Sequence, residues 1–196
     1  MTILLFTDQF SEDRFSLLEL QRSKHEFTIV PAFLNKVHAA LREEIGLLPK
    51  AAQPQIPSFN SVVDLSERLR KQEVRSLEVE SALVCINQLA AFISTVEGSP
   101  EGCSSTNGIV VGYGLGQLSA AAVACSDNVL ELVTVATEAV RLAFRVGAVV
   151  RKCSAPLQSF RTSDLPWTAV IDEDLHQVTE RLQTLQNELH DCIQRL

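Results

Sequence analysis

The sequence predicts an α/β fold that is rich in helix, and three observations support this prediction. Residues 2–6 form a short apolar run, which is typical of a buried strand. A second, β-branched run begins at Gly108 and leads through clustered glycines into small residues that predict a helix. Elsewhere, apolar residues recur at helical spacing over long segments. Strands that alternate with helices are typical of α/β proteins.

The composition limits the classes of function. The chain has 196 residues, 46% of them hydrophobic, which is ordinary for a globular protein. Its net charge of −7 argues against a nucleic-acid surface and against docking on an anionic membrane. Residues 1–8 lack the basic lead of a signal peptide, and no stretch approaches the ~18 apolar residues of a membrane span. A cytoplasmic location is therefore expected.

The cysteines and histidines give no metal-binding or disulfide pattern. The five cysteines are far apart and lack a C-x-x-C pair, so we expect reduced thiols that are mostly buried as small hydrophobic residues. The four histidines are equally scattered and none forms an H-E-x-x-H pair. No metal site is predicted.

Before residue 152, apolar spacing predicts five helices besides the one after the glycines, at residues 11–20, 31–45, 61–71, 76–96 and 128–151. In the second of these, an apolar residue stands at every fourth position from Phe33 to Ile45, and Glu43 and Glu44 are expected on the solvent side. Ser126 and Asp127 are candidate N-caps of the last helix. Residues 153–164 are expected to form a loop.

The last 30 residues predict a strand and an amphipathic helix. Residues 167–171 have the apolar character of a short strand. The helix expected at 172–196 has leucines seven residues apart, at Leu175, Leu182, Leu189 and Leu196. About three heptads are the minimum for a coiled coil, so self-association and docking on the chain's own domain both remain open.

The glycine stretch GIVVGYGLG at 108–116 is the main candidate site, and three interpretations compete. A dinucleotide fingerprint would need a small residue at Gln117 and a second strand ending in an acidic residue about 20 residues later, where a helix is expected instead. A plain tight turn needs only the conformational freedom of glycine. The third interpretation is the nucleophile elbow of an acyl transferase, with Gly114 at the nucleophile position.

Several segments, in order along nearly the whole chain, favour the third interpretation. They resemble the starter-unit acyl-carrier-protein transacylase domain of fungal non-reducing polyketide synthases. No single segment is specific, but the ordered set is. The segments are Leu4–Gln9, Ala39–Ile45, Pro57–Phe59, Glu80–Leu89, Gly112–Ala124 and Ala139–Gly147.

The resemblance implies a malonyl-transferase-like fold with an α/β-hydrolase-like part and a ferredoxin-like insert. Residues 1–165 would form part of the large subdomain, and 166–196 the first strand and helix of the insert. Such domains move a starter acyl group from a thioester donor to the phosphopantetheine arm of a carrier protein and work beside a ketosynthase. They attack with an elbow Cys that a His activates. Phosphopantetheine thioesters would be the substrates, and no bound cofactor is expected.

Carried onto this chain, the family's site is incomplete. Gly114 replaces the nucleophile, and none of the four histidines matches the catalytic one. Leu115 would supply an oxyanion N–H group, Gln88 would line the pocket, and Gly112 and Gly116 would flank the elbow. Malonyl-specific relatives carry an Arg where Val146 stands, so an uncharged acyl group is expected.

Three hypotheses follow for the function of the chain. The first is a degenerate transacylase-like domain that no longer transfers acyl groups. The second is a non-catalytic module that binds an acyl-pantetheine arm or assembles through its last helix. The third is a working transferase completed by another chain, which is disfavoured because Gly114 still lacks a nucleophile.

Overall fold

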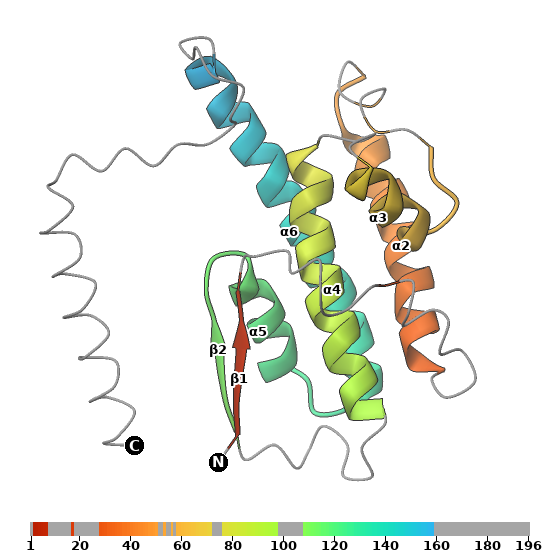
Figure 1. Cartoon of the computed structure of the whole chain (residues 1–196), viewed down its shortest axis with the longest axis vertical. Coiled ribbons are helices and arrows are strands. Elements are labelled where there is room, and N and C mark those ends of the chain that lie inside the picture. Colours follow the sequence, from red (N-terminus) through yellow and green to blue (C-terminus); the bar gives the residue numbers. More distant parts are fainter. Residues whose placement is uncertain are drawn as a thin grey trace, which may run out of the picture. The chain divides into compact units, whose positions relative to one another are not determined.

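A computed structural model of the chain describes residues 2–7, 17, 28–50, 53, 56, 58–71, 76–97 and 108–158. In these residues the order of elements is β1 (Thr2–Phe6), α2 (Ile29–Leu47), α3 (Val62–Arg70), α4 (Leu77–Glu97), β2 (Gly108–Gly112), α5 (Gly116–Ala124) and α6 (Val129–Gln158) (Figure 1). The predicted helix-rich α/β class is confirmed. The two predicted strands at 2–6 and 108–112 are the strands observed.

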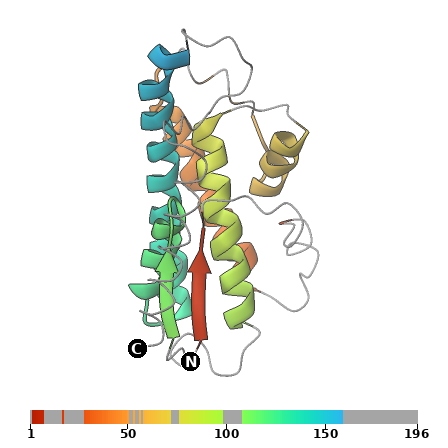
Figure 2. The same cartoon turned by 60° about the vertical axis from the view of Figure 1, so that its left-hand side comes forward.

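The two strands pair in parallel although about a hundred residues separate them in the sequence. Thr2 lies opposite Gly108 and Phe6 lies opposite Gly112. Figure 2 shows both strands pointing the same way, side by side. Helix α5 contacts both strands, and α4 contacts α5 as well as α2. Parallel strands need a long crossover, which here contains α2, α3 and α4.

Helix α4 is the centre of the hydrophobic core. The predicted helix at 76–96 is observed, and buried residues lie on several of its sides: Val79, Ala82, Leu83, Cys85, Ile86, Leu89, Ala90 and Ile93. Among the described helices α4 alone has the length and hydropathy of a membrane span, yet 67% of that apolar window is buried inside the protein. It is therefore a core helix, surrounded by its own chain.

Helix α2 begins where a carboxylate from α4 binds its first turn. Glu97 accepts hydrogen bonds from the backbone N–H groups of Ile29 at 2.9 Å and Val30 at 3.3 Å. Burial opposes ionisation of Glu97, but these hydrogen bonds and those from Thr28 hold its pKa below the usual value. A carboxylate at this position satisfies N–H groups that a helix leaves free and interacts favourably with the helix dipole.

Three predictions about the helices were wrong in detail. Glu44 is buried rather than solvated, because it forms ion pairs with two arginines of α6. The N-cap of α6 is Asn128, whose Oδ1 accepts the N–H of Glu131 at 2.9 Å, rather than Ser126 or Asp127. Helix α6 also extends to Gln158, so residues 153–158 of the expected loop are helical.

Several predictions lie outside the described residues. Of the helix expected at 11–20, only Leu17 is described, and it is helical and buried. The chain divides into a unit of residues Met1–Pro156 and a second unit of Leu157–Leu196. Nearly all of the second unit is undescribed. The boundary at 165, the strand at 167–171 and the leucine-rich helix therefore stay predictions.

Candidate functional site

The glycine stretch folds into a strand, a sharp turn and a helix. Strand β2 ends at Gly112, and the next N–H group, that of Tyr113, donates to the Phe6 carbonyl at 2.8 Å. Gly114 has a φ of 58° and is the one glycine of the described residues with a positive φ. Helix α5 begins two residues later. This is the backbone layout of a nucleophile elbow, in which the central residue occupies a sparsely populated conformation.

The glycines on either side of Gly114 allow close packing. A Cβ atom at Gly112 would lie 2.5 Å from the Cα of Gln117 and 2.8 Å from the Cβ of Ala120. A Cβ atom at Gly116 would overlap the carbonyl of Phe6 and the N–H of Thr7. Both glycines therefore let α5 approach the sheet, while Gly114 makes the turn. A glycine serves each purpose because it has no Cβ atom and tolerates φ > 0.

The turn that leads into α5 leaves backbone N–H groups without partners among the described residues. Short-range hydrogen bonds satisfy the N–H groups of Gly116, Gln117 and Leu118, with acceptors in residues 113–115 at 3.0–3.2 Å. The Leu115 N–H group has no partner among the described residues. It directly follows the nucleophile position, where acyl transferases place an oxyanion donor. The structure is thus compatible with the role predicted for Leu115.

Gln88 lies at the same end of the sheet. It extends from α4, and its Nε2 donates a hydrogen bond to the carbonyl of Thr7, the residue after β1. Its Oε1 is buried and has no partner among the described residues. Gly116 packs on the same Phe6–Thr7 backbone. The structure therefore brings Gln88 and the elbow together at the carboxyl end of β1. Sequence reasoning missed Thr7, because nothing local links it to a residue 81 positions away.

The elbow itself carries no nucleophile, and the thiols of the described residues do not replace it. Cys85 is fully buried under α5 and accepts a hydrogen bond from the Ser119 hydroxyl at 3.4 Å. Burial raises the pKa of the Cys85 thiol to about 11, although the Ser119 hydrogen bond opposes this. Because the thiolate is the reactive form, Cys85 is an inert core residue.

The other described thiols correct a prediction. Cys125 and Cys153 are exposed, so the expectation of mostly buried cysteines holds for Cys85 alone among the described residues. Cys125 is the residue at which α5 ends, at the opposite end of that helix from the elbow. Cys103 and Cys192 lie outside the described residues.

A histidine base is equally missing from the described part of the elbow region. His38 is the one histidine that the structure describes, and it belongs to α2. Its ring packs edge-on against Phe59, with ring centroids 5.3 Å apart. The buried Nε2 has no partner among the described residues. Among the described residues, no group of three or more His, Cys, Asp or Glu side chains could hold a metal ion.

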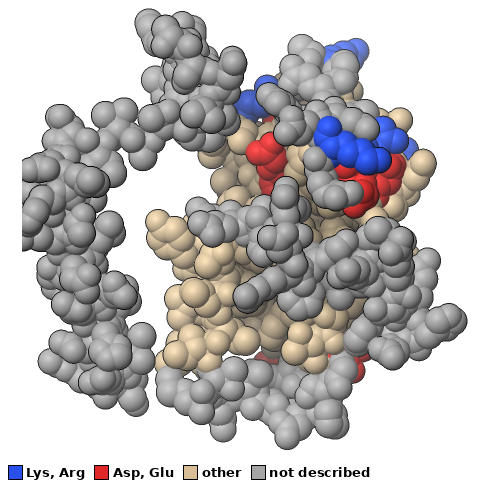
Figure 3. Space-filling model, in the orientation of Figure 1, with Lys and Arg blue, Asp and Glu red and all other residues tan. Residues whose placement is uncertain are grey.

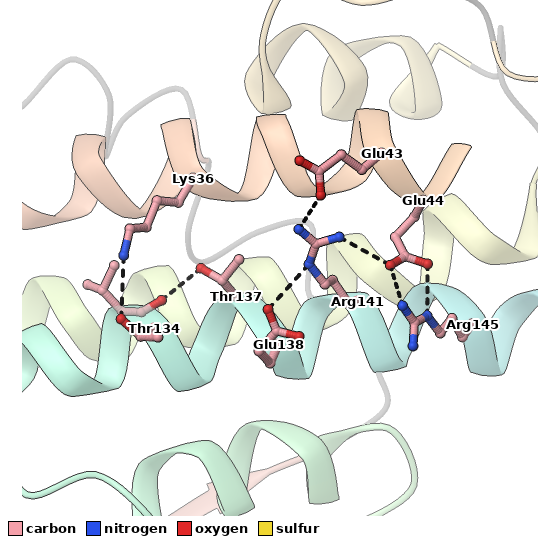
Figure 4. Close-up of polar contacts among 9 residues, drawn as sticks. Lys36, Glu43, Glu44, Thr134, Thr137, Glu138, Arg141 and Arg145 are labelled. Carbon is pink, nitrogen blue, oxygen red and sulfur yellow. Dashed lines mark hydrogen bonds and ion pairs between the residues drawn. The ribbon is translucent and has the colours of Figure 1, made fainter. Parts of the chain in front are cut away.

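Arg145, which precedes Val146 in the sequence, points to α2. Arg145 of α6 donates to both carboxylate oxygens of Glu44, at 2.7 and 2.8 Å, as Figure 4 shows. This bidentate pair lowers the pKa of Glu44 and engages the guanidinium in a structural contact. Val146, the next residue, is 40% exposed.

Comparison with known proteins supports the resemblance. The family described as "Starter unit:ACP transacylase in aflatoxin biosynthesis" matches residues 4–195. The non-reducing polyketide synthase albA of Aspergillus brasiliensis is 36% identical over 170 residues, which are 86% of this chain and 8% of that protein.

Two further relatives also match most of this chain. The non-reducing polyketide synthase aoiG of Aspergillus oryzae is 31% identical over 183 residues, 93% of this chain and 8% of the relative. Desertorin synthase of Aspergillus desertorum is 30% identical over 178 residues, 83% of this chain and 10% of the relative. The chain thus spans a small fraction of the length of the relatives that it matches.

Proposed function

Because the chain belongs to the starter unit:ACP transacylase family, we propose that it is a starter-unit transacylase domain that binds an acyl thioester but does not transfer the acyl group. The observation that carries the proposal is the elbow at Gly114, with its φ of 58° and no side chain. The family match over residues 4–195 supports the starter-unit role.

The missing side chain removes the covalent step. In transfer, a thiolate would attack the thioester carbonyl, form an acyl-enzyme and release the donor thiol. Gly114 has no atom that could make this bond, and Cys85 is buried and protonated. Removing a nucleophile from a triad enzyme leaves only the residual catalysis of the oxyanion hole and of binding.

In this proposal, the chain still binds the acyl thioester. The free Leu115 N–H group would donate to the thioester carbonyl oxygen, and the Gln88 amide would line the pocket beside it. The natural ligands would be acyl-CoA or the acylated phosphopantetheine arm of a carrier protein. An uncharged acyl group is proposed, since Arg145 is paired with Glu44. The carrier protein and the ketosynthase of a cytoplasmic polyketide synthase would be the partners.

Acylation is tested directly by mass spectrometry. The purified chain is incubated with acetyl-CoA and an acyl carrier protein from a related synthase. We expect neither an acetyl adduct on the chain nor acetyl transfer to the carrier protein. A thioester adduct on any cysteine of the chain would contradict the proposal. A related transacylase that keeps its elbow Cys is the positive control.

A second candidate function is a non-catalytic module that binds an acyl-pantetheine arm within a polyketide synthase assembly and has no part in loading the starter unit. The Oε1 of Gln88, which is buried and has no partner among the described residues, favours it, because a buried polar atom without a protein partner can receive a hydrogen bond from a ligand. Calorimetry with acetyl-CoA tests binding, and Gln88→Leu should weaken it at least several-fold. Self-association through Leu175, Leu182 and Leu189 is a separate proposal, which light scattering after size exclusion would test.

A further inference from the structure

Tyr113 directly precedes Gly114 in the elbow, and its side chain is 69% exposed. It is the one tyrosine in the sequence of the chain. A tyrosine usually buries much of its ring, because the ring contributes a large apolar surface and only the hydroxyl group needs a polar partner. An exposed ring beside the candidate site is therefore available to contact a ligand.

The backbone of Tyr113 is held on both sides, so its side chain projects from a well-defined position. The N–H group donates to the Phe6 carbonyl at 2.8 Å, and the carbonyl of Tyr113 accepts the N–H group of Gly116 at 3.0 Å. A tyrosine side chain has only two χ angles, so little conformational entropy is lost when the ring contacts a ligand. The ring can therefore bind a ligand without a change in the fold of the elbow.

Exposure divides the elbow region into a buried side and an open side. The Oε1 atom of Gln88 and the residue Gly116 are buried, and Leu115 is half-buried, whereas Gly114 and Tyr113 are exposed. An acyl thioester has two ends, which are the acyl group and a pantetheine arm tethered to a nucleotide or to a carrier protein. Because the tethered end must reach solvent, the arm has to leave the elbow by its open side. Tyr113 is the aromatic residue on that side.

The sequence around the elbow is uncharged, which suits the arm better than the phosphates of a nucleotide. Residues 2–7 and 108–124 contain no Asp, Glu, Lys, Arg or His. Figure 3 likewise shows the acidic and basic side chains gathered away from the strands on the face in view. Pantetheine is uncharged and alternates amide groups with methyl and methylene groups, so an aromatic ring with a hydroxyl group matches its chemistry.

We propose that Tyr113 binds the pantetheine arm of the acyl thioester, a role that rests on the proposed function of the site. The ring packs against the apolar groups of the arm while the Leu115 N–H group binds the thioester carbonyl oxygen. Because acyl-CoA and an acylated carrier protein share this arm, Tyr113 contributes to the binding of both. The side chain acts on binding alone, and no bond forms or breaks at it.

The single tyrosine makes this contact directly measurable by nuclear magnetic resonance. Isotope labelling of tyrosine rings in the whole chain gives signals from Tyr113 alone. We expect these signals to shift with pantetheine, which lacks an acyl group and a nucleotide, and to shift in the same direction with acetyl-CoA and with an acetylated carrier protein. Signals that move with acetyl-CoA but not with pantetheine would place the ring on the acyl group or the nucleotide and would overturn the proposal.

Calorimetry on variants tests the same contact. Tyr113→Ala should raise the Kd of acetyl-CoA about five- to tenfold, and the Kd of CoA by the same factor, because both ligands carry the arm. Tyr113→Phe keeps the ring and should stay within about twofold of the parent. Leu47→Ala is the control, because its side chain is 75% exposed at the end of α2, and it should leave both Kd values unchanged. Both alanine variants should melt within about 2 °C of the parent.

The outcomes separate the role of Tyr113 from the proposed function. If the parent binds acetyl-CoA and Tyr113→Ala binds it equally tightly, Tyr113 is not part of the site, while the proposed binding of the thioester stands. If Tyr113→Ala weakens acetyl-CoA but not CoA, the ring contacts the acyl group and the proposal is wrong. If the parent binds neither acetyl-CoA nor an acetylated carrier protein, the proposed function and the role of Tyr113 both fail.

Discussion

At the scale of single residues, the three glycines of the elbow serve different purposes. Gly112 and Gly116 are required for space, because any side chain would collide with α5 or with the backbone after β1. Gly114 is required for conformation, since its φ of 58° disfavours every residue that has a Cβ atom. In a transacylase with an elbow Cys, this strain would be part of the cost of presenting the nucleophile.

Restoring the cysteine should therefore destabilise the chain. We expect Gly114→Cys to lower the free energy of unfolding by about 1–2 kcal/mol, which thermal denaturation will measure. Gly46→Cys is the matched control, because a Cβ atom there meets nothing within 4 Å and its φ is not positive. The control should be neutral or slightly stabilising. A higher melting temperature for Gly114→Cys would contradict the elbow geometry.

The restored thiol should still not transfer acyl groups, because the described elbow region lacks a histidine base. The assay with acetyl-CoA and a carrier protein applies to this variant too. Transfer by Gly114→Cys at a rate near that of an intact relative would mean that a base lies beside the elbow after all.

The half-buried Gln88, whose Oε1 atom is fully buried, gives a second prediction. Gln88→Leu loses the hydrogen bond to the Thr7 carbonyl but also removes the unpartnered Oε1, so its free energy of unfolding should stay within about 1 kcal/mol of the parent. Gln88→Glu should cost about 2 kcal/mol at pH 7, since a half-buried carboxylate would face the same carbonyl oxygen.

The pH dependence of Gln88→Glu distinguishes this cause from a packing defect. A protonated Glu could donate to the Thr7 carbonyl, so the new carboxyl should have a raised pKa in the folded state. Stability should then fall as the pH rises from 5 to 8, relative to the parent. Denaturant unfolding at several pH values measures this trend, and a difference that is independent of pH would contradict it.

At the scale of elements, ion pairs to the buried carboxylate of Glu44 join α2 to α6. Glu44 accepts hydrogen bonds from Arg145 and from Arg141, whose Nη1 lies 3.2 Å from Oε1 (Figure 4). Arg141 also contacts Glu43 and Glu138, which are 64% and 66% exposed. The hydrogen bond from Arg145 is the largest cause of the lowered pKa of Glu44, and the hydrogen bond from Arg141 adds to it. The two helices are thus connected by one buried carboxylate.

Glu44→Gln should reduce the free energy of unfolding by about 2 kcal/mol at pH 7, because it leaves two arginines without their buried charge partner. Glu43→Gln, one residue away and exposed, should cost about 0.5 kcal/mol or less. Because the folded pKa of Glu44 is lowered, its contribution is complete above the unfolded value of about 4.3 and is lost as the pH falls below it. Urea denaturation at pH 7 and pH 3.5 should therefore show a large gap between the parent and Glu44→Gln that narrows in acid.

Apolar periodicity predicted the helices well but could not predict the contacts between them. The spacing of Val79, Leu83 and Ile86 identified α4 because burial repeats with the helical period. Glu44 was assigned to the solvent because a charge has no partner until α6 is placed beside α2. The end of α6 was missed because Pro156 and small polar residues indicate a loop locally, although the observed helix contains them.

The same distinction applies to the candidate site. A strand, a glycine turn and a helix could be predicted from residues 108–124, because the signals are local. The meeting of Gln88 with Thr7 at the elbow could not, since it depends on the parallel pairing of strands about a hundred residues apart. The family resemblance supplied Gln88 as a site residue where local pattern had indicated only a polar position in a core helix.

At the scale of the whole molecule, the unit of residues Met1–Pro156 is built around α4. This helix contacts α2 and α5, and it also carries Gln88 and the Glu97 carboxylate that binds the first turn of α2. One helix therefore connects the core, the start of α2 and the candidate site. Loss of core packing along α4 should consequently disturb the site and the fold together.

Leu89→Ala tests this connection, because Leu89 is fully buried and follows Gln88 in α4. It should lower the free energy of unfolding by about 3 kcal/mol, since the methyl groups removed leave a cavity. Leu130→Ala makes the same change on α6, where the leucine is 70% exposed, and should stay within about 0.5 kcal/mol of the parent. Hydrogen exchange should show the slowest amides in α4, and Leu89→Ala should accelerate exchange in α4 and α5 together, because both would open by global unfolding. Faster exchange confined to one turn of α4 would show instead that the effect of the substitution is local and that α4 is not the centre of the unit.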